Sequence, residues 1–318
     1  MTFKFHNKKS IVNFTKKMCE LPPNRGTPDL IIEHIKESKL DFQEINKEFP
    51  LLNAVDRNGK VIIIKHQPKP FESSTYLVGK GLCFDTGGYN LKNQNMHEMK
   101  FDKCGAMCVY SILRACHLQN YPENIIGILP LAQNLIGESC TLPGSVITTL
   151  DNIGTEVEIV DTDAEGRLVL ADVLTYLQTE SPKKVISIAT LTGACASALG
   201  SKYSGLFGND LIKDDEGYGF ANDIKRDAYD SGDNVWRMPL DEFHLDLLKP
   251  KGSKWLKNYT PKGCGGSTAA AFLNYFVDNR YPWVHLDIAG TAWEGDKATG
   301  RPTELLLKFL ENEVNRNR

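Results

Sequence analysis

Residues 157–177 read VEIVDTDAEGRLVLADVLTYL. A strand-like apolar run, 157–160, comes first, an acidic segment follows it, and a helix-like run, 168–177, comes last. The other strand-like runs are residues 61–64, 76–78, 82–84, 125–131, 185–189 and 284–288, and the other helix-like runs are 106–118, 268–277 and 305–310. Alternating strands and helices are typical of an α/β fold. We therefore expect a mixed, mostly parallel central sheet flanked by helices.

The first 60 residues differ in composition from the rest, because they are polar and rich in Lys, Asn and Glu. Ile11, Phe14 and Met18 recur at helical spacing, and Thr27 before Pro28 is typical of the start of a second helix. We interpret residues 1–60 as an N-terminal helical arm or linker and residues 61–318 as one catalytic domain.

Composition excludes several classes of protein. The 318 residues carry a formal net charge of -3, whereas nucleic-acid binders usually have a basic excess. No apolar run is long enough to span a membrane, and the start lacks the apolar core of a secretory signal. The eight cysteines are dispersed without a C-x-x-C pair, which is typical of free thiols in a reducing compartment. We expect a cytoplasmic protein with no nucleic-acid or membrane partner; since the first 19 residues lack acids, organelle targeting is the alternative.

The acidic segment is the strongest local signal for chemistry. If it is extended, residues two apart point the same way, so Asp161, Asp163, Glu165 and Arg167 would face one side at the carboxyl end of a strand. Ligands bind at such strand ends in open α/β sheets. Converging carboxylates repel one another unless a cation neutralises them. The alternative is a solvated acidic turn that begins the next helix.

Two further segments carry charged residues beside glycine turns. Residues 78–88 read VGKGLCFDTGG, with Lys92 shortly after them, and residues 99–106 read MKFDKCGA. Glycines at such turns allow a close approach of the backbone. The alternatives are a glycine-rich hairpin with surface charges for the first segment and a helix N-cap role for Asp102 in the second.

The absence of certain motifs restricts the kinds of metal or catalytic site that the sequence can form. No paired-histidine motif is present, and we expect structural roles for the isolated His97 and His285. A metal site would therefore consist mainly of carboxylates, which suit Mg, Mn and also Zn, and two ions could share bridging carboxylates. There is no G-x-S-x-G motif, and Cys104 lacks a histidine partner in the sequence, which disfavours nucleophilic catalysis.

Together, VGKGLCFDTGGYNLK, MKFDKCGA and DTDAEGRLVLADVLTY closely resemble, in order and spacing, the leucine (cytosol) aminopeptidase family of di-metal exopeptidases. The resemblance continues through IATLTGACASALG and WVHLDIAGTAW and covers residues 13–310. It implies a zinc-exopeptidase-like catalytic domain.

The resemblance also implies roles for particular residues. The positions of the family's ligands for two divalent ions (Zn or Mn, alternatively Mg) are occupied by Lys80, Asp85, Asp102, Asp163 and Glu165. Asp85 and Glu165 would bridge the ions, and Lys80 would ligate as a neutral amine with a depressed pKa. The two catalytic positions are Lys92 and Arg167, with a bicarbonate held at Arg167 as proton shuttle. The substrate-pocket positions are Met99, Thr190, Leu191 and Gly193.

The activity implied is that of a metal-dependent aminopeptidase, which removes N-terminal residues, preferably apolar ones such as Leu or Met, from small peptides with water activated by two metal ions. The family also implies a homohexamer, a dimer of trimers. One alternative is a low-activity metal-binding scaffold or regulatory protein on the same fold. Another, a two-metal phosphoester hydrolase, would need a phosphate cradle that the sequence does not contain.

The sequence departs from the family pattern at three points. Asp161 stands where the family usually has asparagine, and Cys104 stands where it usually has glycine. Since Lys80 is reached after only 79 residues, we also expect the family's separate N-terminal α/β domain to be absent.

Overall fold

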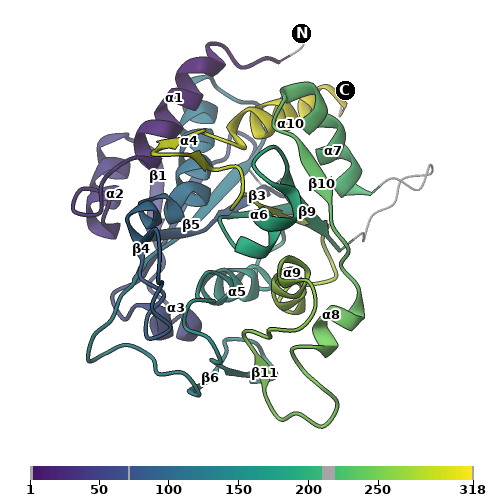
Figure 1. The fold of residues 1–318 in the computed structure, drawn as a ribbon. Helices are drawn as coiled ribbons and strands as arrows, with labels where there is room; N and C mark the ends of the chain where they lie inside the picture. The colour runs from purple at the N-terminus through teal and green to yellow at the C-terminus, as the bar shows by residue number, and fades with distance from the viewer. Residues whose placement is uncertain (1–2, 71, 210–218, 317–318) are drawn as a thin grey trace.

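The computed structural model describes residues 3–70, 72–209 and 219–316. These residues form a central nine-stranded sheet with helices on both faces (Figure 1). The strands are β1 (Asp41–Glu44), β2 (Lys60–His66), β3 (Thr75–Gly79), β4 (Gly81–Asp85), β5 (Ile125–Asn134), β8 (Lys184–Ala189), β9 (Ser204–Gly208), β10 (Val235–Arg237) and β12 (Trp283–Asp287). Their order is β1-β2-β5-β3-β8-β12-β9-β10, and β4 also pairs with β5.

The sheet is mixed and mostly parallel, as the alternating pattern predicts. Parallel pairs join β3 to β5 and β8, β4 to β5, β8 to β12, and β9 to β10. Antiparallel pairs join β1 to β2, β2 to β5, and β9 to β12. In the parallel centre, the carboxyl ends of β3, β5, β8 and β12 therefore meet at one edge.

Alternate residues of each strand enter different cores. Ile62 and Ile64 of β2 pack with one set of helices, whereas Val61 and Ile63 pack with the other. The first core contains α1 (Lys8–Cys19), α2 (Pro28–Glu37), α4 (Cys104–Leu118), α7 (Phe220–Ser231) and α10 (Thr303–Arg316). The second contains α3 (Pro50–Val55), α5 (Gly166–Leu177) and α9 (Gly265–Tyr275). The remaining helices are α6 (Gly193–Leu199), α8 (Glu242–Asp246) and the 3-10 helix η1 (Met96–Lys103).

The strand before the acidic segment is not part of the central sheet. That strand, β7 (Glu156–Glu158), lies in a separate three-stranded sheet with β6 (Val146–Thr148) and β11 (Leu256–Lys257). The acidic residues do follow a strand, as expected, but the run at 157–160 supplies only a short strand, and it lies outside the open central sheet. A two-stranded hairpin, β13 (Trp293–Glu294) and β14 (Lys297–Ala298), completes the described strands.

The N-terminal segment packs closely on the rest of the chain. Helix α1 lies against α4 and α10, and β1 forms the edge of the central sheet beside β2 (Figure 1). The division of the chain at residue 60 stays a prediction. Within the described ranges no helix is long and apolar enough to cross a membrane. All eight cysteines are free, as predicted.

Candidate metal centre

Segments far apart in sequence meet at the carboxyl edge of the central strands. Lys80 lies between β3 and β4, and Asp85 is the last residue of β4. Asp102 lies in η1, next to the start of α4, and Glu165 immediately precedes α5. Ligand atoms of Asp85, Asp102 and Glu165 all lie within 4.8 Å of one another, and all three side chains are buried. The structure therefore brings together residues that the three sequence motifs contribute separately.

Lys80 is at the centre of one half of this cluster. Its Nζ lies 2.8 Å from Asp102 Oδ1 and 3.0 Å from Glu165 Oε1, and it donates to the carbonyl oxygen of Thr190 at 3.0 Å. Asp102 Oδ1 also accepts from Thr190 Oγ1 at 2.7 Å. Asp102 is thus not the N-cap of α4, a position that Lys103 occupies, and that alternative is wrong.

Lys92 organises the other half. Its Nζ lies 2.7 Å from Asp85 Oδ2 and also contacts Asp163 Oδ1. The other oxygen of Asp85, Oδ1, accepts from the backbone N–H of Gly87 and from Nδ2 of Asn134, each at 2.8 Å. Each of the two lysines therefore pairs with two carboxylates.

Glycines allow the crowded approach of these segments. A Cβ atom at Gly166 would lie 2.6 Å from Lys80 Cε and 2.7 Å from its Nζ, so only glycine lets the start of α5 contact this lysine. Gly87 has φ of 87°, which favours glycine, and a Cβ there would lie 2.9 Å from Asp163 Oδ1. The glycine-rich segments are part of the site, so the reading of the first as a surface hairpin is wrong.

The arrangement of the acidic segment differs from the expected extended run. Residues 162–163 form a turn, and Glu165 already has helical backbone angles. Asp161 uses its Oδ1 to accept from the backbone N–H of Asp163 instead of facing the cluster. The two-residue alternation fails because a turn rotates successive side chains in a way that a strand does not. Asp163 and Glu165 still reach the site.

The donor set fits divalent cations. Asp102 Oδ2 and Glu165 Oε2 are buried and lack a hydrogen-bond partner among the residues that the structure describes. Burial, together with the neighbouring carboxylates, raises the pKa of Asp102 to about 7 and that of Asp163 to about 7, and it raises the pKa of Glu165. Such crowding of buried carboxylates is relieved when a cation is shared between them, and oxygen ligands suit Mg, Mn and Zn.

The charge state of Lys80 depends on burial and on the neighbouring carboxylates, which shift its pKa in opposite directions. Burial acts to lower the pKa of Lys80, but Asp102, Glu165 and Asp85 raise it above that of a free lysine. In the metal-free protein Lys80 is therefore an ammonium group. The depressed pKa expected for Lys80 applies to the metal-bound site. There the positive charge of two cations would lower the pKa of this lysine, whereas the carboxylates alone raise it.

Arg167 lies near the cluster but does not pair with its carboxylates directly. Its guanidinium is buried, NH1 donates to the carbonyl oxygen of Asn258 at 2.8 Å, and Nε has no hydrogen-bond partner in the described part of the chain. Burial lowers the pKa of Arg167 to about 10, so the group stays cationic at neutral pH. This buried cation can hold an anion but cannot serve as a base.

Of the four predicted pocket residues, Thr190 and Leu191 lie in the loop between β8 and α6, and Gly193 and Met99 lie in helices. Thr190 contacts Asp102 as described, and Leu191 donates its backbone N–H to Asp287 Oδ1 at 3.2 Å. Gly193 begins α6, and Met99 lies half-buried in η1. Their contact with a substrate stays a prediction.

Sequence reasoning missed two buried polar residues that hold the site in place. Asp287, at the end of β12, accepts from the backbone N–H groups of Leu191 and Thr192 and from Thr192 Oγ1. Asn134, at the end of β5, donates to Asp85. The available signal was a polar residue at the carboxyl end of a buried strand-like run, the same rule that was applied to the acidic segment.

Comparison with known proteins gives consistent matches. A profile described as "Cytosol aminopeptidase family, catalytic domain" matches residues 13–307. A probable cytosol aminopeptidase of Burkholderia multivorans is 48% identical over 94% of this chain and 61% of its own length. A probable cytosol aminopeptidase of Buchnera aphidicola subsp. Schizaphis graminum is 41% identical over 96% of this chain and 63% of its own length. The chain thus spans less than two thirds of the length of these relatives.

Solved structures show the same similarity in three dimensions. The bottromycin maturation enzyme BotP in complex with Mn superposes with a TM-score of 0.86 at 30% sequence identity, covering 96% of this chain and 70% of that one. The leucine aminopeptidase LAP1 of Caenorhabditis elegans gives a TM-score of 0.86 at 26% identity, covering 96% of this chain and 65% of that one.

Proposed function

Because the chain belongs to the cytosol aminopeptidase family, we propose that it is a metal-dependent aminopeptidase, a hydrolase that removes N-terminal residues from small peptides. The observation that carries this proposal is the cluster of four carboxylates with two lysines among them. Three of the carboxylates, Asp85, Asp102 and Glu165, are buried, and Asp163 is exposed. Lys80 and the four carboxylates would hold two divalent ions, Zn or Mn and alternatively Mg. The catalytic domain would comprise residues 61–318, and residues 1–60 would be its N-terminal arm.

When bound, the ions supply a Lewis acid for the peptide carbonyl and lower the pKa of a water molecule so that it can attack near neutral pH. Asp85 and Glu165 would supply negative charge to both ions. Thr190 holds Asp102 in position through its hydroxyl group, and the start of α5 places Glu165 beside Lys80. The free α-amine of a peptide can take an open coordination position, which an internal peptide bond cannot do.

Lys92 and Arg167 are the catalytic residues in this proposal. In the metal-free chain Lys92 is an ammonium group: burial acts to lower its pKa, but Asp85, Glu165 and Asp163 raise it above that of a free lysine. It would stabilise the negative charge that develops on the carbonyl oxygen. Arg167, which has a free Nε and cannot be a base, would hold a bicarbonate that moves the proton.

The substrate preference follows from the residues beside the cluster. Met99 and Leu191 are apolar, and with Thr190 and Gly193 they would line a pocket for an apolar first side chain such as Leu or Met. The assembly proposed is a homohexamer, a dimer of trimers, located in the cytoplasm.

The proposal is tested by hydrolysis of Leu-Gly and Met-Gly dipeptides by the full chain, after treatment with a chelator and again after Mn²⁺ or Zn²⁺ is returned. We expect turnover only with metal, and no turnover of the N-acetylated dipeptides, because acetylation removes the amine. Absence of activity with either metal, or equal cleavage of acetylated substrates, would contradict the proposal. Tight metal binding without turnover would instead support the low-activity scaffold.

A further inference from the structure

Asn134 connects three segments of the candidate metal centre. It ends β5 directly beside the end of β4, because Asn134 and Asp85 are paired in the parallel ladder. Its side chain is 4% exposed. Its backbone carbonyl accepts from both the N–H and the hydroxyl group of Thr86, at 2.8 and 2.9 Å. Main-chain hydrogen bonds therefore fix the position of Asn134 independently of its side-chain contacts.

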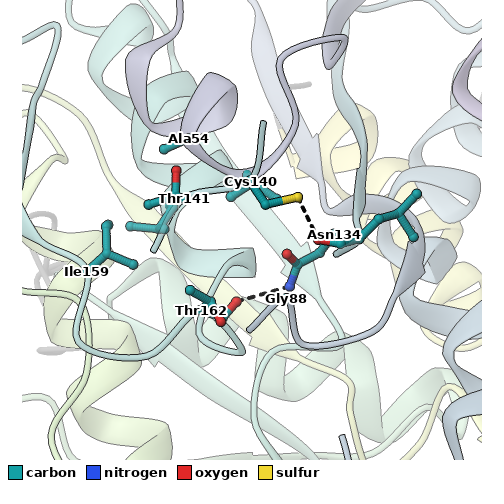
Figure 2. A pocket seen from close by; sticks show the side chains of 10 residues that line it. Ala54, Gly88, Asn134, Cys140, Thr141, Ile159 and Thr162 are labelled. Atoms are coloured by element: carbon teal, nitrogen blue, oxygen red, sulfur yellow. Dashed lines mark hydrogen bonds between the residues drawn. The ribbon is translucent and has the colours of Figure 1, made fainter. Parts of the chain in front are cut away.

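Both hydrogens of the Asn134 amide are used within the site. Nδ2 donates to Asp85 Oδ1 at 2.8 Å. It also donates to the carbonyl oxygen of Thr162 at 3.0 Å, and Figure 2 shows these two residues side by side. Thr162 stands next to Asp163 and makes a second link, from its Oγ1 to the carbonyl oxygen of Gly87 at 2.7 Å. One neutral amide thus bridges the segment that carries Asp85 and the turn that carries Asp163.

The two carboxylate oxygens of Asp85 have different partners. Oδ1 accepts from Asn134 and from Gly87, whereas Oδ2 faces Lys92. Without the amide, Oδ1 would retain one donor, and the carboxylate could rotate about its terminal torsion, which is broad for Asp. The neutral amide also adds no charge to segments whose carboxylates already repel one another.

We propose that Asn134 is a positioning residue of the metal centre: it orients the carboxylate of Asp85 and holds the Asp163 turn beside it. The inference rests on the proposed metal site, and it concerns how that site is organised before a cation binds. Mutation of a group that orients a metal ligand typically lowers metal affinity about 10- to 100-fold.

The chain offers a matched control. Asn124 is also 4% exposed, and its Nδ2 also donates to two protein oxygens, the carbonyls of Lys69 and Glu72. It contacts none of the candidate ligands. Asn134→Ala and Asn124→Ala each remove two amide donor contacts, and Asn124→Ala also removes the acceptor of the Lys69 backbone N–H at 2.9 Å. Only Asn134 lies in the metal centre.

The experiment titrates Mn²⁺ alone into the full-length chain freed of metal, by calorimetry. We expect Asn134→Ala to bind Mn²⁺ about 10- to 100-fold more weakly than the parent, and Asn124→Ala to bind within about twofold of it. At saturating Mn²⁺ the kcat of Asn134→Ala should return to within about twofold, with the substrate KM unchanged and the Mn²⁺ activation constant raised. If Asn134→Ala does not fold by circular dichroism, Asn134→Ser, which keeps one donor, is used in the same titration.

Unchanged Mn²⁺ affinity in Asn134→Ala, or an equal loss in Asn124→Ala, would overturn the positioning role. The two proposals can fail separately. A parent chain that binds Mn²⁺ with the expected loss in Asn134→Ala but cleaves no peptide would overturn the aminopeptidase proposal only, whereas a parent chain that does not bind Mn²⁺ would overturn both.

Discussion

Lys80 and Asp102 form an ion pair in the interior of the protein, with Nζ 2.8 Å from Oδ1 and both side chains buried. The same ammonium group also contacts Glu165. In the metal-free chain the positive charge of Lys80 therefore balances two carboxylates whose charge the bound metal ions would balance in the proposed function. The exchange of a proton for a cation at this point has consequences that can be measured.

Metal binding should release protons. Asp102, Glu165 and Asp85 raise the pKa of Lys80, so at neutral pH it is charged and must lose a proton before it can ligate. We expect release of at least about one proton per chain at pH 7.5, from Lys80 and from the protonated fraction of Asp102 and Asp163, and tighter Mn²⁺ binding as the pH rises. Calorimetry in buffers with different ionisation enthalpies measures this release. A binding heat that is independent of the buffer would contradict it.

The two lysines should respond in opposite directions to the same substitution. Lys80→Met removes a proposed ligand and should weaken Mn²⁺ binding. Lys92→Met removes a positive charge that now competes for Asp85 and Asp163, so Mn²⁺ should bind as tightly as in the parent or more tightly. Its kcat should nevertheless fall about 10²- to 10³-fold, the typical effect of removing one donor to a developing oxyanion.

This pair of variants is read by Mn²⁺ titration and by steady-state hydrolysis of Leu-Gly. Lys202→Met, at an exposed position, is the control and should change neither quantity. Weaker Mn²⁺ binding in Lys92→Met, or full kcat in that variant, would show that Lys92 has a different role.

Gly166→Ala should damage the metal centre without unfolding the protein. The new Cβ would lie 2.6 Å from Lys80 Cε, and the end of a lysine side chain moves more easily than backbone. We expect Mn²⁺ affinity to fall at least about 10-fold with little change in the thermal midpoint. Gly137→Ala, where a Cβ meets only Cys140 Sγ at 3.8 Å, is the control. Equal Mn²⁺ binding by the two variants would refute the steric argument.

Asp172 should make stability depend on pH. This buried carboxyl group of α5 accepts from the backbone N–H of Leu52 in α3 at 2.8 Å, and its other oxygen has no partner within the protein. Burial raises its pKa from 3.8 to about 7, although the hydrogen bonds from Leu52 and Leu51 act to lower it. The folded state therefore keeps the proton when the unfolded chain has lost it, and stability present at low pH is lost as the pH rises from about 4 to 7.

The variant Asp172→Asn cannot titrate at this position. Its free energy of unfolding minus that of the parent should rise by about 2 kcal/mol between pH 5 and pH 7, measured by urea denaturation of the metal-free chain. Titrations common to both proteins cancel in this difference. A difference that stays constant over the interval would show that Asp172 keeps an ordinary pKa.

Much of the architecture could be predicted from local pattern. The apolar run at 125–131 lies within β5, and the run at 168–177 lies within α5, because periodicity reports which face of an element is buried. The acidic segment was the main error: its strand lies in a small separate sheet, and its residues form a turn. Periodicity identifies a strand but does not say which sheet receives it, since strand pairing depends on residues distant in sequence.

The sequence by itself determined the kinds of element, their order, and the residue types available for a carboxylate-rich site, because these depend on neighbouring residues and on side-chain chemistry. Only the tertiary structure decided which of those residues meet. Lys80 contacts Thr190 across 110 positions, and Asn134 contacts Asp85 across 49. Contacts of this separation arise from the order of strands in the sheet and from glycines that permit close packing. A short apolar pattern therefore does not encode them.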